Sequence, residues 1–276
     1  MASPLAYRQF GSAQGRVVVY FHGAPGAPYE VALFDRLGKE RGLNVICFDR
    51  FALDRSLTSE SYFLALAEAI SEKAGGVSVD LIGFSIGAFV ALQTCRHLGA
   101  GVRSLHLVSA AVPLEAGDFL TAMAGGGVFR LARIAPARFE YLSRGQGLLA
   151  RSFPAALFNL LFLNASGKDR ALAADSEFRE RMKETLRDCF VERVPGYVRD
   201  IKAYVQPWEA MLSEVTAETH IWHGRQDNWS PVGMANYLAS QLRSCSRVEI
   251  LEGLSHYSCL YQSAERICIQ LALPNG

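Results

Sequence analysis

The first candidate for chemistry is the segment Gly83-Phe84-Ser85-Ile86-Gly87. It lies between an apolar run, residues 77–82, and a run with helical spacing, residues 86–98. A G-x-S-x-G sequence at a strand-to-helix turn is the pattern of a nucleophile elbow. Such a turn forces the serine toward positive φ, at a cost of order 1–3 kcal/mol, and the glycines lack the Cβ atoms that would clash. The alternative interpretation is a glycine-bounded turn with a capping serine.

A serine hydroxyl is a weak nucleophile at neutral pH and needs a general base that a third group orients. Histidine is the expected base, and the chain has six. His256 lies in the predicted loop after the last strand, residues 247–251, and we predict that it is the base. His223, at another strand end, is the rival. The other four are better explained by a turn, a helix end and strand interiors: His22, His97, His106 and His220.

The orienting acid is expected between serine and histidine in the chain order Ser…Asp/Glu…His. Asp227 lies just beyond a predicted strand end and is our candidate. The alternative is an Asx-turn residue that shapes its loop, a role compatible with orienting a histidine. Glu115 and Asp118 are the reserve candidates, whereas Asp49 precedes the serine and would break the order.

Two backbone N–H groups are needed to stabilise the oxyanion of an acyl-transfer reaction. One is expected from Ile86, which follows the serine at a helix N-terminus. The other is expected from the loop His22-Gly23-Ala24-Pro25-Gly26. Pro25 has no N–H, so Ala24 is the predicted donor. The two glycines of the loop would allow a substrate to approach closely.

These residues need a scaffold that brings strand ends together. Strands are predicted for residues 5–10, 16–21, 44–49, 77–82, 102–109, 219–223 and 247–251. Helices are predicted for residues 31–41, 59–73, 86–98, 232–242 and 263–271. This alternation is typical of a parallel sheet with helices on both faces, in which ligands bind beyond the carboxyl ends of the strands. His22, Asp49 and Ser85 all fall at such ends.

The alternation stops between about Pro113 and Pro207, where the pattern is helical with Gly and Pro interruptions. A stretch of roughly 90 residues is too long for a structureless loop. The sequence therefore predicts a core of residues 1–112 and 208–276, with residues 113–207 inserted as a helical lid.

Composition limits the function classes. Half of the 276 residues are hydrophobic, and the net charge of +1 gives no reason to expect a nucleic-acid partner. No apolar run reaches the roughly 20 residues of a membrane span, and residues 1–15 do not resemble a secretion signal. The six cysteines lack metal-ligand spacing and are expected to be reduced thiols, mostly buried. We therefore expect a cytoplasmic protein, and the sequence does not indicate its oligomeric state.

Nearly the whole chain resembles the α/β-hydrolase superfamily, in its lid-bearing branch. The matching residues are His22-Gly23-Ala24-Pro25-Gly26, Asp49-Arg50, Gly83 to Ala88, Gly224 to Asp227, Pro231 and His256. The resemblance implies an α/β-hydrolase fold with a mostly parallel, eight-stranded sheet. It also implies a catalytic triad of Ser85 as nucleophile, His256 as base and Asp227 as acid, with no cofactor and no metal. One departure is Ser255, where a glycine often precedes the family's histidine.

The resemblance implies a reaction on a small-molecule acyl substrate. Haloalkane dehalogenases and epoxide hydrolases of the superfamily have aspartate where this chain has Ser85. Acyl transfer remains, with an acyl-enzyme formed from the carboxylic ester or thioester of a small or medium acyl group. The alternative is hydrolytic C–C cleavage of a diketone-type substrate by the same triad, with a peroxidase-like side reaction also open. A third reading is a non-catalytic, ligand-binding member of the fold.

Specificity is expected from the lid and the pocket walls. The residues we predict at the substrate are His22, Gly23, Phe84, Phe129 and Trp208. The lid also carries five arginines at positions 130, 133, 138, 144 and 151 in an apolar stretch, with only Glu140 opposing them. This composition suits an amphipathic or anionic substrate, or contact with a membrane surface. The alternative is a solvated helix face.

Overall fold

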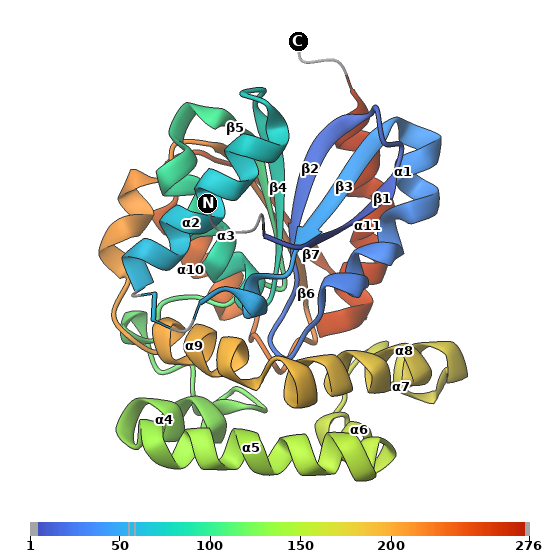
Figure 1. Ribbon diagram of the computed structural model, residues 1–276, viewed down its shortest axis with the longest axis vertical. Helices are drawn as coiled ribbons and strands as arrows, with labels where there is room; N and C mark the ends of the chain where they lie inside the picture. The colour runs from blue at the N-terminus through green and yellow to red at the C-terminus, as the bar shows by residue number, and fades with distance from the viewer. Residues whose placement is uncertain (1–4, 55, 58, 274–276) are drawn as a thin grey trace.

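Seven strands form one sheet in residues 5–54, 56–57 and 59–273, the part of the chain that the computed structural model describes. The strands are β1 (Tyr7–Gly11), β2 (Arg16–Phe21), β3 (Leu43–Phe48), β4 (Val79–Phe84), β5 (Val102–Val108), β6 (Glu218–Gly224) and β7 (Cys245–Leu251). Their order is β1-β3-β2-β4-β5-β6-β7, and β1 alone runs antiparallel to its neighbour (Figure 1). All residues of β3 and β4 are buried, as expected for strands covered on both faces.

The expectation of eight strands is wrong by one for the described residues. A single strand, β1, precedes the parallel strands, and all five of its residues pair with β3. It closes the sheet at that edge, so the described chain has no second antiparallel strand there. The mostly parallel arrangement itself is confirmed.

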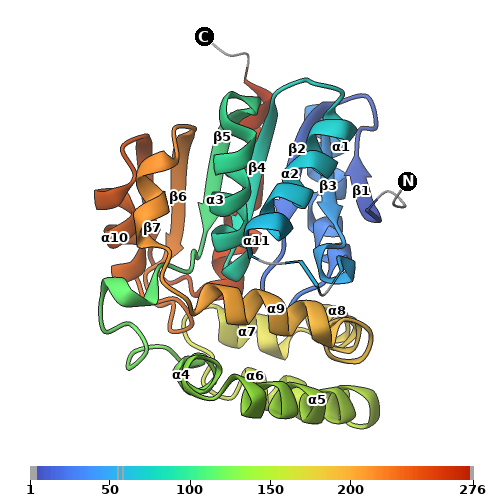
Figure 2. The same cartoon turned by 60° about the vertical axis from the view of Figure 1, so that its left-hand side comes forward.

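Helices cover both faces of the sheet, as the strand–helix alternation predicts (Figures 1 and 2). One face carries α1 (Asp35–Arg41) and α11 (His256–Ala272), which pack against each other. The other carries α2 (Ser59–Ala74), α3 (Ile86–Leu98) and α10 (Gly233–Gln241). The helix predicted for residues 31–41 begins instead as a 3₁₀ helix, η1 (Pro28–Phe34), and becomes α-helical only in α1. No helix of the described residues is long and apolar enough to cross a membrane.

The chain between β5 and β6 is helical and lies at the carboxyl ends of the parallel strands (Figures 1 and 2). Its helices are α4 (Gly126–Ile134), α5 (Pro136–Ser152), α6 (Pro154–Leu161), α7 (Asp169–Ala174), α8 (Ser176–Arg187) and α9 (Val194–Tyr204). In both views α9 lies next to the sheet domain, and α4 and α5 lie farthest from it. We call this segment, residues 113–207, the insertion.

A buried ion pair joins the insertion to the sheet domain. Arg50 donates from Nε to Asp200 of α9 at 2.8 Å and from Nη2 to the carbonyl of Gly23 at 3.2 Å. Arg50 is 2% exposed and Asp200 is fully buried. Next to them, a Cβ on Gly196 would lie 2.2 Å from the carbonyl oxygen of Phe51, so only glycine allows this approach. The loop that contains Ala24 is thereby tied to α9.

A second polar group beneath the same loop makes stability depend on pH. Glu30 accepts from the backbone N–H of Ala27 at 2.9 Å and from the Tyr20 hydroxyl at 3.3 Å. Burial raises the pKa of Glu30 from 4.5 to about 7, and the Ala27 N–H opposes this only in part. Between these pH values the folded state holds more protons than the unfolded state. The stability from this group is present below pH 4.5 and is lost as pH rises through about 7.

We expect the Glu30→Gln variant to lack this loss. Relative to the variant, the wild type should lose about 2–3 kcal/mol of unfolding free energy between pH 4.5 and pH 7.5. Urea unfolding at a series of pH values measures the difference, and the exposed Glu40 provides a matched Glu→Gln control. Equal pH dependence in wild type and variant would contradict the buried-carboxylate explanation.

Candidate active site

Ser85 sits in the strained turn that the sequence predicts. It follows β4 with φ 55° and ψ −124°, and α3 begins at the next residue. A Cβ on Gly87 would lie 2.1 Å from the carbonyl oxygen of Phe21, and one on Gly83 would lie 2.6 Å from Cα of Ala88. Both positions therefore exclude any other residue unless the backbone shifts. The positive φ and the steric need for both glycines are confirmed.

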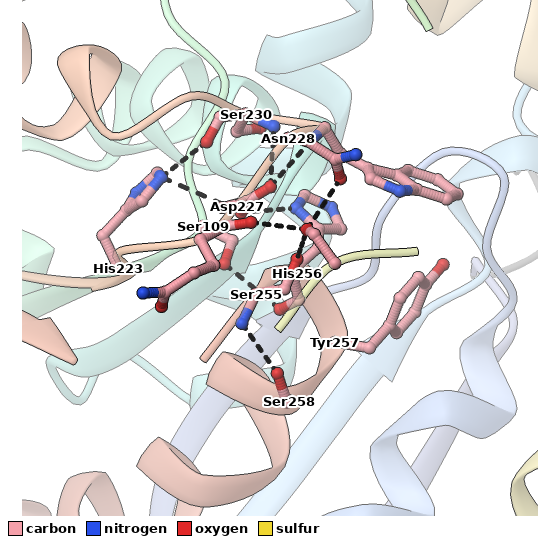
Figure 3. Close-up of polar contacts among 12 residues, drawn as sticks. Ser109, His223, Asp227, Asn228, Ser230, Ser255, His256, Tyr257 and Ser258 are labelled. Carbon is pink, nitrogen blue, oxygen red and sulfur yellow. Dashed lines mark hydrogen bonds and ion pairs between the residues drawn. The ribbon is translucent and has the colours of Figure 1, made fainter. Parts of the chain in front are cut away.

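Asp227 and His256 lie in direct contact, although Asp227 follows β6 and His256 follows β7 (Figure 3). Nδ1 of His256 is 2.8 Å from Oδ2 of Asp227. The other carboxylate oxygen, Oδ1, accepts from the backbone N–H groups of Trp229 at 2.8 Å and Ser230 at 2.9 Å. Asp227 thus shapes its own loop and holds the imidazole at the same time. Because its acceptor is a carboxylate, Nδ1 carries the hydrogen, which leaves Nε2 free to accept a proton.

The surroundings of Asp227 keep it ionised. Burial raises the pKa of Asp227, but His256, His223 and the Ser230 N–H outweigh this and bring it below its ordinary value of 3.8. His223, the rival base, lies on the side of Asp227 opposite His256 (Figure 3). It is fully buried and its Nε2 lies 2.7 Å from the carbonyl of Ser230. Burial also lowers the pKa of His223, so at neutral pH His223 is an uncharged imidazole beside the Asp227 carboxylate.

His256 is held beside the elbow by packing on both sides. Its ring lies 4.9 Å from the ring of Phe84, the residue before Ser85, and stacks on Trp229 at 5.3 Å and 18°. Ser109 donates from Oγ to the carbonyl oxygen of His256 at 3.2 Å. Among the hydrogen bonds of the described residues, none joins Ser85 Oγ to His256 Nε2. Such contacts often tighten only when substrate binds.

The sequence predicts that His256 lies in a loop, but in the structure it is the first residue of α11. The helix starts seven residues before its predicted start because its first N–H groups have acceptors. Ser258 Oγ accepts from the N–H of Ser255 at 2.8 Å, and Asp169 of the insertion accepts from the N–H groups of Tyr257 and Ser258. Ser255, the departure from the family pattern, is therefore the N-cap of this helix.

The two predicted oxyanion donors lie beside the serine. Ala24, Ser85 and Ile86 line one cavity, and neither Ala24 N–H nor Ile86 N–H donates to an acceptor in the described chain. His22 holds the loop by placing Nδ1 2.8 Å from the Gly23 carbonyl. Burial and then the Arg50 charge lower the pKa of His22, which makes it a neutral, structural imidazole. The free N–H groups are available to a negatively charged oxygen.

The cavity at Ser85 has a volume of about 100 Å³ and is mostly apolar. Residues of the insertion form most of its wall, among them Met123, Val128, Phe129, Leu157, Leu161, Phe190 and Tyr197. Polar side chains are few: Ser85, Gln146, Tyr197 and Ser230. The cavity thus offers an apolar compartment with a hydroxyl and two N–H groups at one end.

Four of the five residues predicted at the substrate do not line this cavity; Phe129 does. Phe84 is fully buried behind the elbow, against His256. Trp208 packs on Phe89 at 4.9 Å and donates to the Tyr204 carbonyl, so it belongs to the core beneath the insertion. His22 and Gly23 instead act on the backbone of the loop, as described above.

Trp229 both lines the cavity and stacks on His256, and it is not among the residues that we predict at the substrate. Its position two residues after Asp227 is the signal that could have identified it. The reserve acids are engaged elsewhere: Glu115 accepts from the N–H groups of Trp208 and Glu209, and Asp118 from the Thr121 hydroxyl. Asp227 is the carboxylate that contacts the His256 imidazole.

The chain is similar to known proteins over almost its full length. A model of the alpha/beta hydrolase family matches residues 18–269, whereas a search of curated proteins gives no match. Among solved structures, an esterase from Exiguobacterium antarcticum is 20% identical with a TM-score of 0.63, covering 97% of this chain and 93% of that chain. MGS-M2, an alpha/beta hydrolase enzyme from a Medee basin deep-sea metagenome library, is 14% identical with a TM-score of 0.68, covering 97% and 92%. The meta-cleavage product hydrolase from Pseudomonas fluorescens IP01 is 18% identical with a TM-score of 0.66, covering 96% and 92%.

These structures show a shared fold. The match to the family model shows membership of a family as well as a fold, because it covers most of the chain. It runs from within β2 to within α11 and includes the elbow, Asp227 and His256. The chain belongs to the alpha/beta hydrolase family.

Proposed function

We propose that this protein is a serine hydrolase that cleaves a carboxylic ester or thioester through an acyl-enzyme on Ser85. The observation that carries the proposal is the contact between Asp227 and His256, at 2.8 Å, next to a serine held at φ 55°. Ala24 and Ile86, whose backbone N–H groups have no acceptor in the described chain, line the same cavity. This combination supplies a nucleophile, an oriented base and an oxyanion site.

In the proposed reaction, Ser85 Oγ attacks the carbonyl carbon and its proton passes to His256 Nε2. The negative oxygen of the tetrahedral intermediate accepts hydrogen bonds from the N–H groups of Ala24 and Ile86. The intermediate expels the alcohol or thiol, which takes the proton from His256, and leaves the acyl group on Ser85. A water molecule then attacks the acyl-enzyme, with His256 again taking the proton, and the free acid leaves.

The cavity supports an uncharged acyl group of small or medium size. Its volume is about 100 Å³, and the residues that line it include no Lys, Arg, Asp or Glu. The arginines at positions 130, 133, 138, 144 and 151 lie outside this lining. We therefore propose that residues 113–207 act as a lid whose apolar inner wall selects the acyl chain. A cytoplasmic location, which the sequence predicts, is part of the same proposal.

Turnover of p-nitrophenyl esters from acetate to dodecanoate tests this function. We expect a maximum at short or medium chains, because the apolar cavity is small. A diketone substrate in the same series tests the alternative of C–C hydrolysis, which the likeness to a meta-cleavage product hydrolase supports. Absence of turnover of every ester above background would refute the esterase proposal. Ester binding without turnover would instead favour a ligand-binding member of the fold.

A further inference from the structure

The outer layer of the insertion concentrates exposed apolar side chains in a short stretch of the chain. Helices α4, α5 and α6 lie on the side away from the sheet (Figures 1 and 2). Of the sixteen large apolar side chains that are exposed in the described chain, eight fall within residues 134–163. They are Ile134, Tyr141, Leu142, Leu148, Leu149, Phe153, Leu160 and Leu163. We call residues 126–163 the outer helical face.

On α5 the exposed apolar residues follow helical spacing. The adjacent pair Tyr141 and Leu142 is repeated two helical turns later by Leu148 and Leu149, and Leu148 is 72% exposed. The buried positions of α5 are Phe139, Ser143 and Ala150, on the opposite side. The helix therefore has an inner side that packs on the insertion and a second, apolar side without a partner in the described chain.

The same face is strongly basic. Its five arginines, at positions 130, 133, 138, 144 and 151, are exposed, and none forms an ion pair with an acidic side chain of the described residues. Its one acidic residue, Glu140, is 3.1 Å from Lys202 of α9. In a chain of net charge +1, the outer helical face thus concentrates positive charge next to apolar surface.

The combination of apolar side chains and positive charge indicates what binds to the outer helical face. In a symmetric dimer each face would meet its own copy, and the arginines of one protomer would oppose those of the other. An anionic lipid surface offers negative headgroups to the arginines and an acyl boundary to the leucines and phenylalanine. We propose that the outer helical face docks the protein onto an anionic lipid bilayer surface. This proposal is independent of the reaction at Ser85.

Co-sedimentation with vesicles tests the docking. We expect the wild type to bind vesicles of equal parts phosphatidylcholine and phosphatidylglycerol, and to bind pure phosphatidylcholine much less. The double variant Arg138→Gln/Arg151→Gln should lower the partition coefficient roughly 30-fold, from the loss of two charges at the surface. Leu148→Ser/Leu160→Ser should lower it about tenfold or more, by removing apolar contact.

Matched variants elsewhere should bind like the wild type. Arg8→Gln/Arg41→Gln removes the same charge from exposed positions of β1 and α1, and Leu64→Ser/Val77→Ser removes exposed apolar side chains near α2. Equal losses in these controls would overturn the proposal, because binding would then follow net charge or overall hydrophobicity. No binding to anionic vesicles would overturn it as well, as would a dimer in analytical ultracentrifugation that the face variants dissociate.

A different observation concerns the connection between α6 and α7, residues 162–168, and the first residue of α7. This part of the insertion touches the loop of the proposed acid, Asp227, and the residues just before the proposed base, His256. The Asn164 carbonyl accepts from Asn228 Nδ2 at 2.7 Å, and Ser166 Oγ lies 2.9 Å from Ser255 Oγ. The N–H of Lys168 donates to the carbonyl of Gly253 at 2.9 Å. Figure 3 shows Asn228 and Ser255 on either side of the Asp227–His256 pair.

Asp169 makes the strongest of these contacts. It is 1% exposed, and its two carboxylate oxygens accept from the N–H groups of Tyr257 at 3.0 Å and Ser258 at 2.7 Å. These N–H groups belong to the first turn of α11, which begins with His256 and has no intrahelical acceptor for them. A buried carboxylate at this helix end is stabilised by both hydrogen bonds and the helix dipole.

We infer that Asp169 is a positioning residue, through which the insertion sets the place of the His256 imidazole relative to Asp227. Ser166 supports it by linking Ser255, next to His256, to the loop of Asp227. This inference rests on the proposed function, in which His256 is the base. It predicts that the insertion contributes to the geometry of the base as well as to the substrate cavity.

The variant Asp169→Asn tests this role against Asp175→Asn. Asp175 caps α8 by accepting from the N–H of Phe178 at 2.8 Å, and so has the same capping chemistry far from His256 in the hydrogen-bond network. We expect Asp169→Asn to lower kcat for the preferred ester roughly 10- to 100-fold with KM nearly unchanged, because the base is displaced while the cavity is intact. Ser166→Ala, a smaller change, should lower kcat in the same direction. Asp175→Asn should leave kcat unchanged.

A spectroscopic measurement separates this inference from the proposed function. The proton on His256 Nδ1, hydrogen-bonded to Asp227, should give a far-downfield ¹H NMR signal in the wild type and in Asp175→Asn. In Asp169→Asn and Ser166→Ala the signal should shift or broaden, whether or not any ester is turned over. An unchanged signal together with an unchanged kcat in a folded Asp169→Asn protein would overturn the positioning role. Unchanged kinetics with a lower melting temperature in both Asp169→Asn and Asp175→Asn would show capping alone, and would overturn it too.

Discussion

Replacing Ser85 by alanine is expected to lower kcat by about 10⁶-fold, the loss found when a triad nucleophile is removed. Ser85 is held at φ 55° between two glycines whose Cβ positions are blocked, and it carries the hydroxyl that faces the cavity beside the Ala24 and Ile86 N–H groups. Without that hydroxyl no acyl-enzyme forms. Steady-state hydrolysis of the preferred p-nitrophenyl ester measures the loss.

Ser240→Ala is the matched control, since Ser240 lies exposed on α10 and contacts only its own helix through the Tyr237 carbonyl. It should retain full activity. Both variants should have the melting temperature of the wild type to within a few degrees, because alanine keeps the Cβ of Ser85 and so leaves the backbone strain of the turn unchanged. A Ser85→Ala protein with undiminished kcat would exclude Ser85 as the nucleophile.

Replacing Asp227 by asparagine is expected to lower kcat by about 10⁴-fold. The amide would offer its carbonyl or its NH₂ to Nδ1 of His256, so the imidazole would no longer be held in the tautomer that leaves Nε2 free to accept a proton. The charge that stabilises the imidazolium would also be lost. Wild-type Asp227 supplies that charge at neutral pH, because its pKa lies below the ordinary 3.8.

Glu115→Gln and Asp118→Asn are the controls for this prediction, because these acids were the alternatives at the level of sequence. Their carboxylates accept from Trp208, Glu209 and Thr121, and both variants should keep kcat within a few-fold of the wild type. A near-normal rate in Asp227→Asn, with a large loss in one of the controls, would transfer the role of the acid to that residue.

Much of the fold was predictable because buried parallel strands have a strong sequence signal. The runs at residues 16–21 and 44–49 are mostly apolar and include β-branched residues, and each corresponds to a largely buried strand of the structure. The elbow was predictable for a steric reason. Gly83 and Gly87 lie where another part of the backbone leaves no room for a Cβ atom, and this need is visible in the sequence as two glycines around a serine. The seven strands predicted from the residues correspond to the seven observed, whereas the expected eighth strand came only from the family resemblance.

The features that the sequence does not predict depend on contacts between segments that are far apart in the chain. The start of α11 at His256 depends on Asp169, which lies 87 positions away in the insertion and supplies acceptors for the helix end. The cavity wall depends on how the insertion packs, so residue type alone does not distinguish Trp208 from Trp229. Trp229 faces the cavity because Asp227 binds its N–H and fixes the loop, whereas Trp208 turns into the core against Phe89.

The central claim is that Ser85 is an activated nucleophile. Its most direct test is to label the wild-type protein with a fluorophosphonate and to map the adduct by peptide mass spectrometry. We predict a single phosphonylated residue, Ser85, with labelling that slows sharply in Asp227→Asn and is blocked by a good ester substrate. An unlabelled wild-type protein, or an adduct on any residue other than Ser85, would contradict the proposed mechanism.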